Sequence, residues 1–322
     1  METTMIIEEN NQAPKKGMAS RRRKRAIFYA LVMALPLLQF AIFYVYVNFN
    51  SFLLSFQTFV GWNEPVFAGM DNIKVAFEKL TSSGVMFKNS AILYLINTVI
   101  VLPLTMLFAY YLSKKYLGSG VFKTLLFLPQ IVSGLVLGII YKYVTTDVYI
   151  AVQKLMGVEE VAPNGLLFMK DTAFGAVLFY NVFMGFGAHI LMFTGAMSGV
   201  DNSVIESAQL DGVTAFQEFW YITVPMIWPT FTTFFVTGLA AIFTNQMGLF
   251  NLYGGSIDNH DLYTMGYFLY VETRRSNTYI PPSAKYMSYS QLAALGLLLT
   301  FIVAPITLIS KKLLRKYGPS VD

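Results

Sequence analysis

Long apolar runs alternate with shorter polar stretches along most of the chain. A helical run of about 20 residues with few charges matches the hydrocarbon thickness of a bilayer. Six such runs predict six membrane-spanning helices, at approximately 26–48, 91–112, 124–144, 173–197, 229–252 and 291–309. The first run is too long for a signal-peptide core and has no small-residue cleavage pattern. We therefore expect an all-α membrane protein, with one six-span domain over residues 26–316.

Composition supports the membrane class and excludes several kinds of site. Hydrophobic residues make up 55% of the chain and charged residues only 13%. No cysteine is present, which excludes disulfides, thiol catalysis and thiolate metal sites. The two histidines, His189 and His260, are too few for a histidine-based metal centre, so we expect no metal and no cofactor bound by this chain.

The placement of basic residues predicts the topology. Residues 1–25 read as a disordered basic tail, in which Arg21–Arg25 directly precedes the first apolar run. Fourteen of the 23 Lys and Arg lie in short segments on the side of the N-terminus, which predicts that both termini, including a short tail at 317–322, are cytoplasmic. Topology thus explains the basic charge without nucleic acid. The loop at 198–228 contains no Lys or Arg, so it does not contribute to this rule.

The 198–228 loop is a polar, acidic interruption between the fourth and fifth predicted spans. Ser203–Glu206 fits a capping box that begins a short helix, and Asp211–Gly212 fits the exit of that helix. Thr214–Gln217 fits a second capping box, and Pro225 is predicted to end the second helix, since the residue before a proline is disfavoured in a helix. Helical spacing predicts that four side chains share one face: Phe216, Phe219, Trp220 and Thr223.

The spacing within this loop also resembles a known signature. Glu206, Ala208, Gly212, Ile222 and Pro225 match the Glu-Ala-Ala…Gly…Ile-x-Leu-Pro coupling loop of ABC-importer permeases. Two positions depart from that signature, both conservatively: Ser207 in place of Ala and Val224 in place of Leu.

Further motifs narrow the resemblance to the carbohydrate-uptake, maltose-type group of these permeases. They are Asp211-Gly212, Phe219-Trp220, the Phe-x-Gly-x-x-Asn segment of Phe67, Gly69 and Asn72, and Leu128-Pro129 followed by Gly134 and Gly138. Gly134 and Gly138, one helical turn apart, also allow close approach of helices. The resemblance covers roughly residues 65–316.

The resemblance implies a type I ABC-importer permease that moves a carbohydrate, most simply an oligosaccharide, by alternating access in the bacterial cytoplasmic membrane. It implies a second permease subunit in a heterodimer, two cytoplasmic ATPase subunits that hold ATP and Mg, and an extracytoplasmic solute-binding protein. The residues expected to couple to the ATPase are Glu206, Ser207, Ala208, Asp211, Gly212 and Pro225. This chain has no Gly-Lys pair and hence no P-loop, so it is expected to be a transport subunit and not an enzyme.

Uncharged polar residues within the spans are candidates for the substrate path, because neutral amides and aromatic faces suit sugars. We expect Asn245 and Gln246 first, then Asn181, with Tyr141 and Tyr180 nearby. Other polar residues of the spans are Asn97, Gln130 and His189. For each residue, a hydrogen bond between helices is the competing interpretation.

Other functions are weighed against this one. A secondary carrier or channel would work without an ATPase, but the predicted spans hold no Asp or Glu of the kind that proton coupling commonly uses. A membrane-embedded enzyme or scaffold would need a catalytic cluster, and none is visible. An ABC permease for an amino acid, phosphate or glycerol phosphate stays open, although a phosphorylated solute favours Arg or Lys in its path.

Overall fold

The computed structural model describes residues 16–59, 65–158, 164–255, 257, 259–276 and 286–319. The chain divides into two compact units, Met1–Leu54 and Ser55–Asp322, where the sequence predicted one domain over 26–316. The described residues are mainly helical, which confirms the predicted all-α membrane class.

The first unit is a long apolar helix. It consists of α1 (Lys16–Phe40), the π-helical η1 (Ala41–Tyr46) and α2 (Val47–Leu54). Over Arg22–Leu54 it is long and apolar enough to cross a membrane. The predicted disordered tail is wrong at its C-terminal end, because α1 begins at Lys16 and includes Arg21–Arg25. Arg and Lys are good helix formers, so the helix of the apolar run continues through these basic residues. Residues 1–15 lie outside the described part of the chain.

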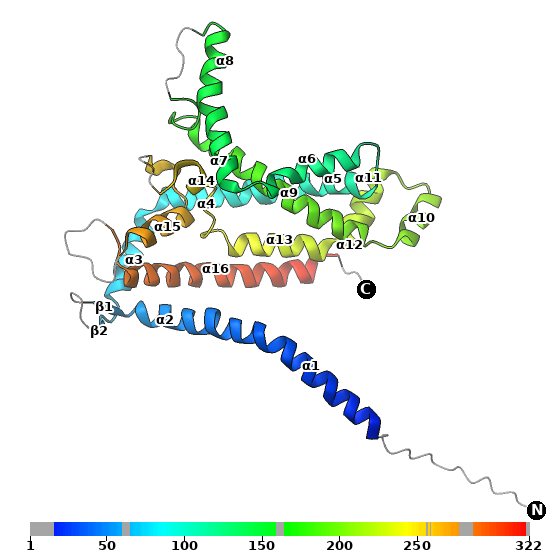
Figure 1. Cartoon of the computed structure of the whole chain (residues 1–322), viewed down its shortest axis with the longest axis horizontal. Helices are drawn as coiled ribbons and strands as arrows, with labels where there is room; N and C mark the ends of the chain where they lie inside the picture. The colour runs from blue at the N-terminus through cyan, green and yellow to red at the C-terminus, as the bar shows by residue number, and fades with distance from the viewer. Residues whose placement is uncertain are drawn as a thin grey trace, which may run out of the picture. The chain divides into compact units, whose positions relative to one another are not determined.

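The second unit holds the other elements (Figure 1). Its first half contains β1 (Gln57–Phe59), β2 (Pro65–Phe67), α3 (Asp71–Ser82), α4 (Gly84–Ile96), η2 (Asn97–Val101), α5 (Leu102–Ser113), α6 (Ser119–Ile131), α7 (Gly134–Tyr143), η3 (Val144–Val148) and α8 (Tyr149–Leu155). Its second half contains α9 (Ala173–Ser198), α10 (Asn202–Leu210), α11 (Ala215–Glu218), η4 (Phe219–Thr223), α12 (Val224–Met226), α13 (Trp228–Ala240), α14 (Leu249–Tyr253), η5 (His260–Leu262), α15 (Met265–Arg275) and α16 (Tyr289–Tyr317).

Five described helices can cross a membrane, or six if a bent pair counts as one span. The second, fourth and sixth predicted spans lie within Gly84–Ser113, Ala173–Ser198 and Tyr289–Tyr317. Among these helices, α5 packs along α9, and α13 packs along α16 (Figure 1). The described residues thus contain five of the six predicted spans, and the fifth span is found only if the bent pair Ala215–Met226 and Trp228–Ala240 counts as one span.

The third span is displaced from its predicted position at 124–144. Helix α6 ends at Ile131, Val132 is extended with φ −80° and ψ 141°, and a new helix starts at Gly134. Pro129 inside α6 lacks an N–H donor, which weakens the helix near this break. The apolar helix is Gly134–Leu155. It therefore includes Asp147 and Lys154, which lay outside the predicted span, as well as Lys142, which lay within it.

The fifth span is shorter than the predicted 229–252. Helix α13 ends at Ala240, and the chain is not helical from 241 to 248. The Asn245 side chain accepts a hydrogen bond from the Met247 amide at 2.8 Å, and Met247 and Gly248 have φ of 55° and 70°. An asparagine side chain that bonds to a nearby amide competes with the helix, so the polar pair predicted inside a span interrupts it.

Two hydrophobic clusters form the core of the second unit. The larger joins side chains of α4, α9, α14, α15 and α16, and the smaller joins α5, α9, η4 and the start of α13. Helix α15 contributes to the larger cluster and is itself largely buried.

The motifs before and after the second span have local structural roles. β1 and β2 pair antiparallel, Gly69 turns the chain with φ 58°, and the Asn72 amide donates to the carbonyl oxygens of Ser55 and Gln57 at 3.2 and 2.7 Å. The predicted close approach at Gly138 is confirmed, since a Cβ there would lie 2.6 Å from the carbonyl oxygen of Asn251.

Candidate functional site

The 198–228 loop forms two short helical segments, as predicted, with one different cap. Asp201 begins α10 by accepting a hydrogen bond from the Ser203 amide at 2.9 Å, so the predicted capping box starting at Ser203 is wrong. This bond lowers the pKa of Asp201 below its ordinary value. Gly212 leaves the helix with φ 78°, and Thr214 and Gln217 form the predicted capping box.

Pro225 does not end the second segment, contrary to the prediction. Val224 is helical with φ −60° and ψ −47°, and the helix continues to Met226. A proline ring crowds the preceding turn, and here that turn, η4, is a π-helix, whose wider backbone can accommodate the ring. The direction changes by 67° at Ile227, between α12 and α13.

The predicted shared face of the second segment is divided. Phe219 and Thr223 are buried at 3% exposure, whereas Phe216 and Trp220 are 70% and 45% exposed. Residues four apart share a face, and the two pairs point to different surroundings because the π-helical turn changes the angular spacing. One face of this segment therefore packs on the unit and the other is open.

The six predicted coupling residues lie on this loop with differing exposure. Glu206, Ser207, Asp211 and Gly212 are exposed, and Ala208 and Pro225 are half-buried. The Ser207 hydroxyl donates to the carbonyl oxygen of Ser203 at 2.8 Å, so it bonds within α10. Next to Asp211, Leu210 is 90% exposed. The loop thus presents short polar side chains together with large apolar ones, Leu210 on α10 and Phe216 and Trp220 on the second segment.

The structure attaches this loop to the end of α5 through residues that sequence reasoning missed. Lys114 forms an ion pair with Glu218, and the Tyr110 hydroxyl donates to the carbonyl oxygen of Ala215 at 3.1 Å. The rings of Tyr110 and Phe219 meet edge-on with centroids 5.2 Å apart. No local pattern marks this contact, because Lys114 is one of several lysines after a span and Glu218 is an ordinary helical residue.

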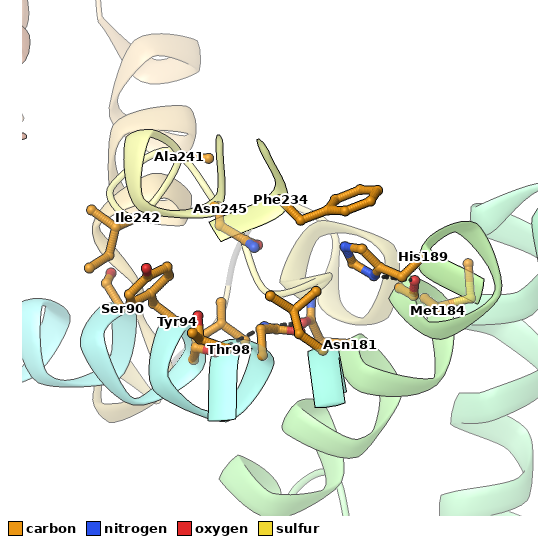
Figure 2. Close-up of a pocket in the computed structure, with 15 residues that line it drawn as sticks. Ser90, Tyr94, Thr98, Asn181, Met184, His189, Phe234, Ala241, Ile242 and Asn245 are labelled. Atoms are coloured by element: carbon orange, nitrogen blue, oxygen red, sulfur yellow. Dashed lines mark hydrogen bonds between the residues drawn. The ribbon is translucent and has the colours of Figure 1, made fainter. Parts of the chain in front are cut away.

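A cavity of about 360 Å³ lies among the helices of the second unit (Figure 2). Its walls come from α4, η2 and the start of α5, from α9, and from α13 with the residues that follow it. Its polar lining residues are Ser90, Tyr94, Asn97, Thr98, Asn181, His189 and Asn245. None of the described residues that line it is Asp, Glu, Lys or Arg.

Three asparagines from three different segments reach this cavity. The Asn97 amide nitrogen lies 3.5 Å from the side-chain oxygen of Asn181 and donates to the Leu93 carbonyl oxygen at 2.9 Å. Asn245 projects its amide from the opposite side, from the non-helical residues after α13 (Figure 2). The predicted residues Asn181 and Asn245 are thus brought to one space, together with Asn97.

His189 lies on the cavity wall beside Phe234. One ring nitrogen is 2.8 Å from the Gly185 carbonyl oxygen, and the ring meets Phe234 edge-on at 4.9 Å. Among the described residues no group of three His, Cys, Asp or Glu side chains is placed to hold a metal ion. The histidine is therefore a hydrogen-bonding member of the wall.

Four other predicted or considered residues do not line this cavity. Tyr141 donates to the Ala176 carbonyl oxygen at 2.8 Å and Tyr180 donates to that of Gly134 at 3.0 Å, so both hold α7 against α9. Gln130 donates to the Met184 carbonyl oxygen, and Gln246 is half-buried outside the lining. For the two tyrosines and Gln130, the structure therefore shows the competing interpretation, a hydrogen bond between helices.

Tyr94, Thr98 and Ser90 line the cavity and were not singled out from the sequence. They lie on one helix with Asn97, and hydroxyl residues are too common in spans to mark a site without knowledge of which face is open. Together the lining offers amide and hydroxyl groups beside aromatic rings. Such a lining can bind a neutral, hydroxyl-rich solute and offers no charge to an ionic one.

Comparisons with known proteins agree with this architecture. The family model described as "Binding-protein-dependent transport system inner membrane component" matches residues 101–322. The multiple sugar-binding transport system permease MsmF of Streptococcus mutans is 25% identical over 292 residues, which cover 88% of this chain and 94% of that protein. The arabinooligosaccharides transport system permease AraP of Bacillus subtilis is 26% identical over 312 residues, 93% of this chain and 94% of that protein.

Solved structures show the same fold. A chain of a bacterial ABC transporter that imports the acidic polysaccharide alginate superposes with a TM-score of 0.68 at 18% identity, covering 94% of this chain and 99% of that one. The alginate transporter in complex with its pentasaccharide-bound periplasmic protein gives a TM-score of 0.67. With several membrane-spanning helices and a family model matched over more than half its length, the chain belongs to the family of binding-protein-dependent transport system inner membrane components.

Proposed function

We propose that this permease subunit imports a neutral carbohydrate, most simply an oligosaccharide, in an ABC importer driven by ATP hydrolysis in partner subunits. The observation that carries the proposal is the cavity, which is lined by three asparagines, hydroxyl groups and aromatic rings and by no charged residue of the described chain. A sugar hydroxyl can replace water at each amide. Relatives that are permeases for multiple sugars and for arabinooligosaccharides support the same class of solute.

The alternatives fit the lining less well. A phosphate or glycerol phosphate would bring a negative charge into a space without Lys or Arg to pair with it. An amino acid carries two charges at neutral pH and meets the same difficulty. The described third span does contain Asp147 and Lys154, but neither lines the cavity. A neutral polyol or sugar is the solute that leaves no unpaired charge.

The remaining assembly follows from the same proposal. A second permease subunit, two cytoplasmic ATPase subunits that bind ATP and Mg, and an extracytoplasmic solute-binding protein complete the importer, and this chain binds no cofactor. Both termini and the 198–228 loop face the cytoplasm in a bacterial cell membrane. The exposed α10, with Glu206, Asp211 and Gly212, docks on an ATPase subunit, and Pro225 and the bend at Ile227 join the loop to α13.

The test is ATP hydrolysis and sugar uptake in liposomes by the complex of this chain with its partner subunits, screened with neutral and acidic saccharides. We expect stimulation by a binding protein loaded with a neutral saccharide. Gly212→Pro should insert normally but lose transport and association with the ATPase, because Gly212 has φ 78° and proline is fixed near −65°. Gly175→Ala, at a helical glycine with open space around its Cβ position, is the matched control.

Two outcomes would overturn the proposal. Uptake that proceeds without an ATPase subunit would make the protein a carrier. Stimulation confined to phosphorylated or acidic solutes would contradict the neutral-sugar assignment. Normal transport by Gly212→Pro would refute only the coupling role of the loop and would leave the rest of the proposal standing.

A further inference from the structure

Glu218 is buried although it belongs to a largely exposed loop. Its side chain is 4% exposed, and its carboxylate pairs with the ammonium group of Lys114, whose side chain is 18% exposed. Lys114 is the C-terminal cap residue of α5. A carboxylate buried without a partner is very unfavourable, and even a buried pair is a weak source of stability, so a pair of this kind calls for a role in specifying one arrangement.

Tyr110, one turn before Lys114, adds two contacts to the same place. Its hydroxyl bonds to the Ala215 carbonyl oxygen, its ring meets that of Phe219, and the Lys114 nitrogen lies 5.4 Å from its ring centroid. Two side chains of α5 therefore hold residues 215–219 from both sides of Glu218. The register between the loop and α5 is fixed by direction-dependent contacts in addition to apolar packing.

This contact connects the loop with a wall of the cavity that is distant in sequence. Helix α9 precedes the loop and α13 follows it, so two cavity walls are joined to it by the chain itself. The third wall is formed by Tyr94, Asn97 and their neighbours, on the single helix Gly84–Ser113 that ends beside Lys114. Tyr110 and Lys114 therefore join the loop to this third wall as well.

We propose that Lys114 and Glu218 are positioning residues that transmit movement of the 198–228 loop to the Gly84–Ser113 helix, an inference that rests on the proposed function. An apolar pair of similar size would allow the loop to slide along α5, whereas the ion pair defines one register. Loss of the pair therefore separates ATP hydrolysis from the rearrangement of the cavity wall, while the loop still docks on the ATPase.

The first experiment compares transport per ATP hydrolysed in liposomes containing the complete complex. We expect Lys114→Met and Glu218→Gln each to lower this ratio about tenfold, in the range of usual coupling between sites, with ATPase association retained. The exchanged pair, Lys114→Glu with Glu218→Lys, should recover most of it. Lys114→Arg is the conservative control and should remain near wild type. Wild-type ratios in both single variants would overturn the proposal.

A second experiment is independent of how well single variants fold. Because the chain has no cysteine, Lys114→Cys with Glu218→Cys creates two unique thiols within it. A short bifunctional methanethiosulfonate reagent joins them, and a reductant separates them again in the same sample. We expect the tethered form to couple hydrolysis to transport and the reduced form to lose about tenfold in the ratio.

The treated wild type serves as the reference in that experiment. Equal ratios in the tethered and reduced forms, whether high or low, would overturn the role of Lys114 and Glu218. A wild-type complex that shows no ATP-dependent transport would instead refute the proposed function, so the two failures are distinguishable.

Discussion

The two ends of the Ser55–Asp322 unit are held together in different ways. At the α15 end, buried polar side chains bond to the backbone of elements far away in the sequence. At the end that carries the 198–228 loop, ring contacts and one ion pair make most of the specific connections. The difference indicates which end keeps its shape and which end can move.

The α15 end contains several such hydrogen bonds. The Asn89 amide donates to the carbonyl oxygens of Asp261 and Tyr263 at 2.7 and 3.0 Å. The Glu272 carboxylate accepts from the Met287 amide at 2.9 Å, and the Ser276 hydroxyl donates to the Met287 carbonyl oxygen at 2.6 Å. Buried hydrogen bonds of this kind are lost as a whole if the elements shift, so this end behaves as one body.

The loop end has fewer bonds of this kind. Besides the Lys114–Glu218 pair and the Tyr110 hydroxyl, the Trp228 ring nitrogen donates to the Leu314 carbonyl oxygen at 3.2 Å. Apolar ring contacts tolerate small displacements at low cost, since each atomic contact is weak. The cavity lies between the α15 end and the loop end.

The largest effect is expected where backbones touch at the rigid end. A Cβ at Gly266 would lie 2.5–2.6 Å from backbone atoms of Thr244 and Asn245, which cannot move without disturbing the break after α13. Gly266→Ala should lower the free energy of unfolding by about 3 kcal/mol. Denaturant titration of the purified protein in detergent measures this, with Gly175→Ala as a control. A loss of the same size in both variants would show that the α15 end is not specially constrained.

A smaller effect is expected at the carboxylate that joins α15 to α16. Glu272→Ala leaves the Met287 amide without its buried acceptor and should cost about 2 kcal/mol of unfolding free energy. Glu272→Gln retains a carbonyl acceptor and should cost less. If both variants unfold like the wild type, the hydrogen bonds at this end are not what holds it together.

In the cavity, the expected effect is on the binding of the solute and not on the stability of the fold. Asn181→Ala removes the oxygen that faces Asn97 and one amide from the lining, and should weaken solute binding by about 1 kcal/mol. That corresponds to a rise of roughly fivefold in the KM for transport. Tyr141→Phe, which alters an interhelical bond outside the cavity, should leave KM unchanged. A larger KM change in Tyr141→Phe than in Asn181→Ala would place the solute elsewhere.

The sequence predicted the elements that depend on local patterns and failed where distant contacts decide. Apolar runs predicted five spans that the structure contains, and a sixth if the bent pair counts as one. Gly212 and the Thr214–Gln217 capping box were correct because a turn and a cap need only neighbouring residues. Pro225 was misjudged, because a preceding π-helical turn accommodates the ring. Of the candidate path residues, Asn181 and Asn245 meet in one space.

The surroundings of the two tyrosines and the Lys114–Glu218 ion pair could not be predicted from local sequence patterns. Whether Tyr141 faces a cavity or the Ala176 carbonyl oxygen depends on how α7 lies against α9, which local spacing does not reveal. Glu218 and Lys114 are separated by more than 100 residues, so nothing in either neighbourhood indicates the other. Long-range packing decides both cases.

The smallest effect belongs to the adaptable end and separates the hydrogen bond from the ring contact. Tyr110→Phe removes the bond to the Ala215 carbonyl oxygen but keeps the ring beside Phe219, so it should cost only about 0.5 kcal/mol. Transport per ATP should then fall about twofold, well short of the loss expected for Lys114→Met. Tyr110→Ala, which also removes the ring, should lower the ratio further. If Tyr110→Phe already equals Tyr110→Ala, the hydroxyl carries the connection and the loop end is held as firmly as the α15 end.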